Sequence, residues 1–350
     1  MKFDTLSARE LDPSLLQQWQ ALLGSRPCYN RPYYQPAWYQ LLATLRPDTR
    51  LTLAYAENTL CGLWPHQAQH HHFNPGLAAP LDDYQGPIYS PHTHIDPAQW
   101  LAASGKRYWR FRHVPAAFQE FQAHRWQDTY TQWMDLEGGY NAYCARLSSA
   151  YNGAKARIIK DAETQERKIR RAYEHVEFQF DNRDPSDFQH MLAGKSRQYL
   201  ETLGPGHDIF AVPWIREVFE RLFHTTADAP FRGYFGSLKV DGQLIAGSFG
   251  IAAGGVLQFN LLWYEPEFAR YSPGTQLLHG CALAAASHGF HTLELGGGDY
   301  DYKARFRTHT MPTFSGAVSR PAALAQAHHR LLKARWAIRD SAWVKRLRHG

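Results

Sequence analysis

The segment Gly233–Leu295 constrains the fold of this chain more than any other part of the sequence. Its first part alternates in the manner of half-buried strands, and Asp241-Gly242 is a dipeptide suited to a tight hairpin turn. Gly254-Gly255 forms a second turn signal further on. The predicted strands are Gly233–Val240, Gln243–Ala252 and Val256–Tyr264. Three successive strands joined by tight turns predict an antiparallel meander.

The residues after the meander predict a loop, a helix and a returning strand. The loop Glu265–Pro273 precedes a helix that runs from about Gly274 to His288 and stops at Gly289. Phe290–Leu295 then predicts a strand beside the third one, which makes the arrangement α+β. Because glycine lets a ligand approach the backbone and a helix N-terminus offers unpaired N–H groups, we expect a phosphate or pyrophosphate at this loop.

A fainter copy of the same order precedes this segment. Its predicted elements are a hairpin over 51–66, a helix near Pro97–Ser104 and a strand over Tyr108–His113, followed by a strand over Asp128–Leu136. The first copy has no glycine-bearing loop before its helix, so we expect only the second copy to keep phosphate binding. The predicted division is 1–136, 137–320 and a basic helical tail over 321–350.

Length and composition favour a globular protein with more than one domain. At roughly 150 residues per domain, a length of 350 residues predicts two domains. The chain has 44% hydrophobic and 20% charged residues, a composition that excludes a disordered protein. No apolar run approaches the roughly 20 residues of a membrane span, and no apolar stretch follows Lys2, so we expect no secretory signal. Four scattered cysteines without a C-x-x-C pair predict a reducing, cytoplasmic setting.

The net charge of +6 lies in the tail, and the rest of the chain is neutral overall. That balance does not support a DNA-binding surface. The tail also carries apolar residues at helical spacing, so it either docks on its own protein or contacts an anionic membrane surface, peripheral to the inner membrane.

A mixed-charge helix over 155–171 either presents a solvated face or binds a phosphorylated ligand. His70-His71-His72 predicts a loop rather than a metal site, because adjacent residues point to opposite sides.

Several motifs of the second half resemble the CelD-type branch of the GNAT acyltransferases. They are Tyr264–Gly274 (YEPEFARYSPG), the helix after it, Gly296–Lys303 (GGGDYDYK) and Phe306. The resemblance covers roughly residues 10–320 and implies tandem GNAT-like folds, similar to the Fem peptidyltransferases, with acyl-CoA as donor and acetyl-CoA foremost. The usual pyrophosphate loop of GNAT proteins is absent, and Pro273 removes one N–H donor.

The resemblance and the chemistry of acyl transfer together suggest site residues and no metal. Asp299 or Glu294 would act as base, Tyr302 would protonate the leaving thiolate, and Lys303 would stabilise an oxyanion or hold a phosphate. The structural alternatives are a turn cap for Asp299, aromatic packing for Tyr302, a surface salt bridge for Lys303 and a solvent-facing Glu294. Expected donor-binding residues are Leu261, Leu262, Ser272, Gly274, Thr275 and Gln276, and expected acceptor-binding residues are Asp83, Tyr84, Asn260, Trp263 and Tyr264.

Three functions stay open on the sequence. The first is an acyl-CoA-dependent N- or O-acyltransferase acting on a sugar or on a polysaccharide or cell-envelope precursor, since aromatics beside carboxylates and amides suit a sugar ring. The second is a Fem-type transferase that uses aminoacyl-tRNA, against which the localised positive charge argues. The third is a non-catalytic accessory protein of polysaccharide synthesis.

Overall fold

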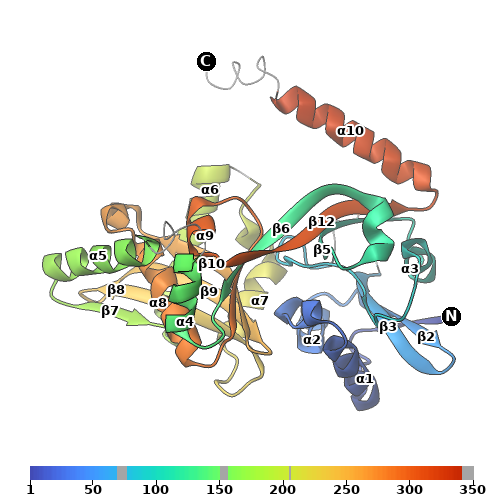
Figure 1. Ribbon diagram of the computed structural model, residues 1–350, viewed down its shortest axis with the longest axis horizontal. Helices are drawn as coiled ribbons and strands as arrows, with labels where there is room; N and C mark the ends of the chain where they lie inside the picture. Colours follow the sequence, from blue (N-terminus) through green and yellow to red (C-terminus); the bar gives the residue numbers. More distant parts are fainter. Residues whose placement is uncertain (69–76, 150–156, 205, 341–350) are drawn as a thin grey trace.

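The computed structural model describes residues 1–68, 77–149, 157–204 and 206–340, with side chains described up to residue 335 (Figure 1). The triplet His70–His72 lies outside the described residues. The main elements of the first half are β1 (Lys2–Ser7), α1 (Pro13–Gly24), α2 (Pro36–Leu45), β2 (Thr49–Ala56), β3 (Thr59–Gln67), β4 (Ile88–Tyr89), α3 (Pro97–Ala103), β5 (Tyr108–Pro115) and β6 (Arg125–Asp135). The expected hairpin is confirmed by the pairing of β2 with β3.

The second half repeats this order and adds further helices. They are α4 (Tyr140–Ser149), α5 (Arg157–Ala172), β7 (Val176–Gln179), α6 (Pro185–Leu203), α7 (Pro213–Phe223), β8 (Phe231–Val240), β9 (Gln243–Ala253), β10 (Val256–Tyr264), η5 (Pro266–Tyr271), α8 (Pro273–Ser287), β11 (Thr292–Gly296), α9 (Asp301–Phe306), β12 (His309–Ser319) and α10 (Ala322–Asp340). The predicted meander is confirmed, since β8, β9 and β10 pair antiparallel in sequence. The returning strand β11 lies beside β10, as predicted, and the pair is parallel.

The two halves exchange their last strands. β6, the last strand of the first half, pairs with β11 of the second half, and β12 pairs with β5 of the first half. β6 and β12 also pair with each other, and Figure 1 shows them side by side between the halves. The result is one eight-stranded sheet of order β5-β12-β6-β11-β10-β9-β8-β7, beside a smaller sheet of order β1-β2-β3-β4. Each half is therefore completed by a strand of the other.

A bulge in β10 decides which of its side chains face which helix. The register of β10 against β9 shifts between Phe259 and Leu261, so Asn260 is the extra residue. Leu257 and Phe259 belong to the core beneath α8, whereas Leu261 and Trp263 belong to the core beneath α6. Without the bulge, alternation would place all four on one face of the sheet.

The tail forms α10, which is described as far as Asp340. Its first turns contact the body: Ala325 is buried, and the ring of His329 stacks on Trp126 with centroids 4.5 Å apart. Figure 1 shows the rest of the helix leaving the body beyond β12. Among the described residues, no helix combines the length and apolarity that crossing a membrane requires. The charged and aromatic residues of 341–350 lie outside the described part of the chain.

Candidate functional site

The strands β10 and β11 pair over a short stretch and then separate. The parallel pairing joins Val256 to Thr292 and ends where Gln258 meets Glu294. Beyond that point β10 carries its bulge, and β11 ends at Gly296, whose positive φ of 69° turns the chain away. We call the region where the two strands separate the β10–β11 divergence. It exposes main-chain groups of β10 that a neighbouring strand would otherwise use.

Two lysines donate to main-chain carbonyls on opposite sides of the divergence. The Nζ of Lys195, on α6, lies 2.8 Å from the Leu262 carbonyl of β10. The Nζ of Lys303, on α9, lies 2.7 Å from the Gly297 carbonyl, just beyond β11. Burial lowers the pKa of both ammonium groups, and the positive charge of Lys303 further lowers that of Lys195, to about 8. The divergence is therefore a positively charged region.

A fully buried ion pair lies behind the divergence, at the seam between the halves. Glu294, on β11, accepts from the Tyr84 hydroxyl and lies 3.3 Å from the Nε of Arg31. The Arg31 guanidinium lies between the rings of Tyr84 and Trp133, 4.4 Å from each centroid. Burial raises the pKa of Glu294, and the nearby Arg31 charge opposes that rise. One carboxylate oxygen accepts a hydrogen bond, and the other lies at ion-pair distance from Arg31 without a hydrogen bond of its own among the described residues. Because neither side chain is exposed, the geometry favours a stabilising role for Glu294.

Beside this pair, His113 and Asp83 lie against the glycines that follow β11. The Nδ1 of His113 lies 3.0 Å from the Asp83 main-chain carbonyl, which requires Nδ1 to carry the proton and leaves Nε2 as a free base. His113 has a positive φ of 49°, a strained conformation for a residue with a Cβ. Burial also lowers its pKa, so the imidazole is neutral. Side chains in place of Gly296 or Gly297 would collide with Asp83 and His113 respectively, which explains the glycines.

Two amides extend this cluster along β10. The Nε2 of Gln258 donates to the Asp83 carboxylate at 3.1 Å, and the Nδ2 of Asn260 donates to the Tyr33 hydroxyl. The Oε1 of Gln258 and the Oδ1 of Asn260 are buried without a hydrogen-bond partner in the described chain. Unsatisfied acceptors of this kind are costly in a folded protein unless a ligand or water pairs with them. The amides therefore suit a ligand that donates hydrogen bonds.

The start of α8 provides the second part of the site. Ser272 takes a left-handed conformation with φ of 50°, and its carbonyl accepts from the N–H groups of both Thr275 and Gln276. The Ser272 N–H itself donates to Ala269. Four main-chain N–H groups were expected to bind a phosphate here. Of these, only that of Gly274 has no partner among the described residues. A Cβ at Gly274 would lie 3.4 Å from Leu262 and Tyr264, so the helix start adjoins the divergence.

The remaining predicted residues lie around this core. Asp299 is exposed and accepts from the Tyr130 hydroxyl of β6. Tyr302 is half-buried near Tyr300, with ring centroids 6.1 Å apart, and burial raises its pKa. Trp263 is buried against Gly194 of α6, and Tyr264 lies beside Gly274. The structure therefore brings Asp83, Tyr84, Asn260, Glu294 and Lys303 together and places Asp299 and Trp263 at the edge.

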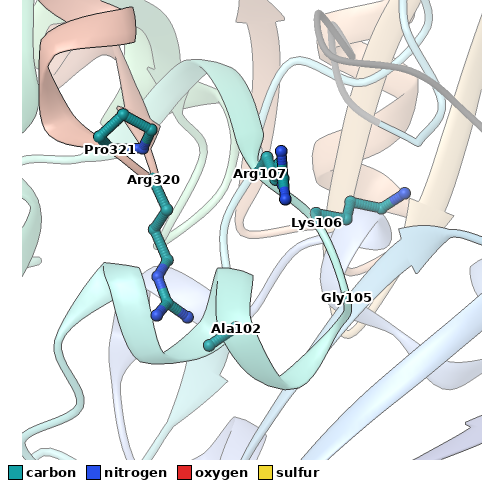
Figure 2. Close-up of a pocket in the computed structure, with 6 residues that line it drawn as sticks. All are labelled: Ala102, Gly105, Lys106, Arg107, Arg320 and Pro321. Atoms are coloured by element: carbon teal, nitrogen blue, oxygen red, sulfur yellow. The ribbon is translucent and has the colours of Figure 1, made fainter.

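A further hollow of about 580 Å³ lies apart from the divergence, between α3 and the turn into α10. Figure 2 shows the side chain of Arg320 extending toward Ala102, whereas the side chain of Lys106 points away from both residues. Its cationic groups do not converge on one point, so it is a weaker candidate than the divergence. Among the described residues, no cluster of three or more His, Cys, Asp or Glu side chains could hold a metal ion.

Several site residues were missed by sequence reasoning, and most come from the first half. Arg31, Tyr33 and His113 lie in segments without a recognisable catalytic motif, and Lys195 lies within an ordinary helix. The one usable signal was Gly296-Gly297-Gly298, since three glycines after a strand indicate that other groups approach the backbone closely. The glycines indicate where other groups approach the backbone, but they do not identify the residues that do so.

A family model matches most of the second half of the chain. Residues 156–304 match the family described as acetyltransferase (GNAT) domain, a range that contains the divergence, both lysines and the start of α8. A search of the curated proteins found no match.

Three solved structures share the fold over nearly the whole chain. FemX has a TM-score of 0.57 at 11% identity, covering 94% of this chain and 100% of that one. A tandem GNAT protein from the clavulanic acid biosynthesis pathway has a TM-score of 0.53 at 12% identity, covering 91% and 98%. The C-terminal domain of a putative lysylphosphatidylglycerol synthetase from Agrobacterium fabrum has a TM-score of 0.53 at 12% identity, covering 92% and 95%. The predicted GNAT fold is confirmed, and these findings support the predicted acyltransferase.

Proposed function

We propose that the chain is an acyl-CoA-dependent N- or O-acyltransferase whose acceptor is a sugar or a polysaccharide or cell-envelope precursor, with acetyl-CoA as the first donor to test. The observation that carries the proposal is the β10–β11 divergence, which adjoins the start of α8 on one side and the seam cluster on the other. GNAT domains typically use acyl-CoA, and residues 156–304 match such a domain.

The donor side of the proposed site consists of main-chain groups. The Leu262 carbonyl points into the divergence, since it accepts from Lys195, and the N–H of the same residue points the same way. These groups suit an extended chain of amides such as pantetheine. The free Gly274 N–H at the positive end of the α8 dipole suits a phosphate. Acyl-CoA, when bound, supplies an acyl group activated as a thioester.

The acid and base roles fall to side chains of both halves. The transfer forms a C–N or C–O bond to the acceptor and breaks the C–S bond, and the acceptor loses one proton. His113 receives that proton at Nε2, because its Nδ1–H is held by the Asp83 carbonyl. Lys303 stabilises the negative charge that develops on the acyl oxygen, and Tyr302 gives its proton to the thiolate. Asp299 orients Tyr130 at the edge of the site.

The acceptor side combines carboxylate, amide and aromatic groups. Asp83 has a side chain about one-third exposed (31%), so a ligand can reach it. The orphaned acceptor of Asn260, which is only part-buried, suits a hydroxyl group of a sugar ring, whereas Gln258 is fully buried and positions Asp83. The resemblance to the CelD-type branch supports a precursor of a polysaccharide or of the cell envelope as the acceptor.

Calorimetric titration with acetyl-CoA, CoA and a long-chain acyl-CoA tests the proposal. The variant Gly274→Asp places a carboxylate at the phosphate position. Its Cβ meets only ordinary contacts, but Gly274 is buried, so a circular dichroism spectrum checks that the variant folds. We expect its affinity for acetyl-CoA to fall by at least about tenfold. Gly24→Asp is the matched control, because nothing lies within 4 Å of a Cβ there. If no CoA species binds the unaltered protein, the proposal is wrong.

A second candidate is a Fem-type transferase that takes its acyl group from aminoacyl-tRNA. The likeness to FemX over 94% of the chain favours it. A further titration with a charged tRNA separates the two candidates. If the protein binds the charged tRNA and none of the CoA species, the Fem-type reaction is favoured. A non-catalytic accessory role would instead leave the cellular phenotype unchanged after substitution of Lys303.

A further inference from the structure

Lys195 is placed in the divergence by an unusual set of contacts. It extends from α6, and its Nζ lies 2.8 Å from the Leu262 carbonyl and 2.8 Å from the Oε1 of Gln198. The ammonium also lies 4.8 Å from the centroid of the Tyr199 ring. All of these partners are uncharged. One of the three N–H donors of the ammonium is left over after the two hydrogen bonds.

No carboxylate forms an ion pair with Lys195 within the described chain. The nearby charge that affects it is that of Lys303, which is repulsive. Lys303 itself feels the carboxylates of Asp83 and Glu294, so its own charge is partly balanced. The surplus positive charge of this region therefore belongs to Lys195. Lys195 is part-buried, and an ammonium in that setting without a counter-ion is stabilised by an anionic ligand.

A cavity of about 220 Å³ lies next to Lys195, between α6 and η5. It is lined by Gly194, Arg197, Gln198, Glu201, Thr202, Trp263, Tyr264, Pro266 and Ala269. Gln198 connects it to Lys195 by a hydrogen bond, and Tyr264 connects it to the start of α8, since its ring lies 3.4 Å from a Cβ placed at Gly274. The lysine, the cavity and the helix start are therefore neighbours.

The start of α8 lacks donors for a doubly charged group. Pro273 has no N–H, and the N–H groups of Thr275 and Gln276 are taken by the Ser272 carbonyl. Gly274 alone offers an N–H, while a pyrophosphate presents several acceptor oxygens. A phosphate-bearing ligand at this position needs a further cation, and the part-buried Lys195 is linked to the helix start through Leu262, which it contacts and which adjoins Gly274.

We propose that Lys195, together with the cavity between α6 and η5, binds the phosphate groups of the acyl-CoA donor. This inference rests on the proposed function and assigns α6 a part in donor recognition. In this structure the ammonium is held by the Leu262 carbonyl. On donor binding it transfers to the phosphates, and the carbonyl becomes available to an amide N–H of pantetheine.

The test compares two donors that differ in phosphate. CoA carries the phosphates, whereas the acetyl thioester of N-acetylcysteamine keeps the thioester and one amide without them. Calorimetric titration of both into Lys195→Met should show CoA affinity reduced by about tenfold, the loss expected for one charged contact. Affinity for the short thioester should stay within about twofold. Lys2→Met is the control, since it removes an exposed lysine from β1.

The outcomes separate this inference from the proposed function. If the unaltered protein binds CoA and Lys195→Met binds it equally well, the role of Lys195 is wrong while the acyl-CoA site stands. Equal losses for both donors would also overturn it, because Lys195 would then contact the thioester arm. If the unaltered protein binds no CoA species, the proposed function and this inference fail together.

Discussion

Removing the charge of Lys195 should make the protein more stable at neutral pH. The pKa of this lysine is lowered from 10.5 to about 8, first by burial and then by the charge of Lys303. The charged form is therefore disfavoured in the folded protein, at a cost to the free energy of unfolding of about 3 kcal/mol at pH 7. Lys195→Met removes that cost. It also loses the hydrogen bonds to Leu262 and Gln198, worth about 1 kcal/mol net.

The expected balance is a gain of about 2 kcal/mol at pH 7, or about 3 °C in Tm for a chain of this length. Because the folded pKa lies below the unfolded one, the penalty is fully present below pH 8 and is relieved as the pH rises from 8 toward 10.5. At pH 9.5 the penalty falls to about 1 kcal/mol, which the lost hydrogen bonds offset. The two proteins should then be about equally stable.

Scanning calorimetry at pH 7 and pH 9.5 on the unaltered protein, Lys195→Met and Lys2→Met measures this difference. The comparison between the two pH values isolates Lys195, because the unaltered protein and Lys195→Met share every other titrating group, while Lys2→Met reports the effect of losing an exposed lysine. A variant that melts below the unaltered protein at pH 7 would refute the reasoning. So would a difference in Tm that is the same at both pH values, since the effect would then arise from packing.

Three further predictions concern the seam. Glu294→Gln keeps an acceptor for Tyr84 but leaves the buried Arg31 charge unpaired, so urea denaturation should show a loss of about 3 kcal/mol; an unchanged midpoint would contradict the ion pair. His113→Gln should lower kcat by about 100-fold or more and remove the acidic limb of the pH–rate profile, with an unaltered circular dichroism spectrum as control. A fragment of residues 137–320 lacks β6, the strand between β11 and β12. It should therefore show no cooperative unfolding transition. A fragment that unfolds cooperatively would show that the strand exchange is dispensable.

The local elements of the second half could be predicted because their signals are local. Asp241-Gly242 and Gly254-Gly255 punctuate the strands, and β10 occupies the predicted residues Val256–Tyr264. The bulge at Asn260 could not be predicted, since it arises from how β10 pairs with β9 rather than from its own composition. That bulge moves Trp263 from the face of the sheet that simple alternation implies to the α6 face, where it packs on Gly194.

The site escaped prediction for a different reason. The ion pair of Arg31 with Glu294 joins opposite ends of the chain, and His113 reaches Gly297 only because the halves meet. Nothing in the residues around His113 signals its left-handed backbone, which is imposed by tertiary contacts. The motif residues Asp299 and Tyr302 were visible because they follow a strand directly, yet Asp299 is the more exposed of the two.

The strand exchange links the two halves in a way that bears on function. Glu294 lies on β11, which pairs with the β6 supplied by the first half, and β6 also carries Thr131 and Trp133 beside the buried ion pair. The first half in turn depends on β12 for the partner of β5, the strand that ends near His113. In the proposed reaction, His113 of one half and Lys303 of the other can keep a fixed separation only if the halves do not rotate against each other. The antiparallel pair of β6 and β12 supplies that restraint through a ladder that keeps its register from His309 to Ser315. The exchange of strands would therefore let the first half contribute His113 to the proposed chemistry of the second half.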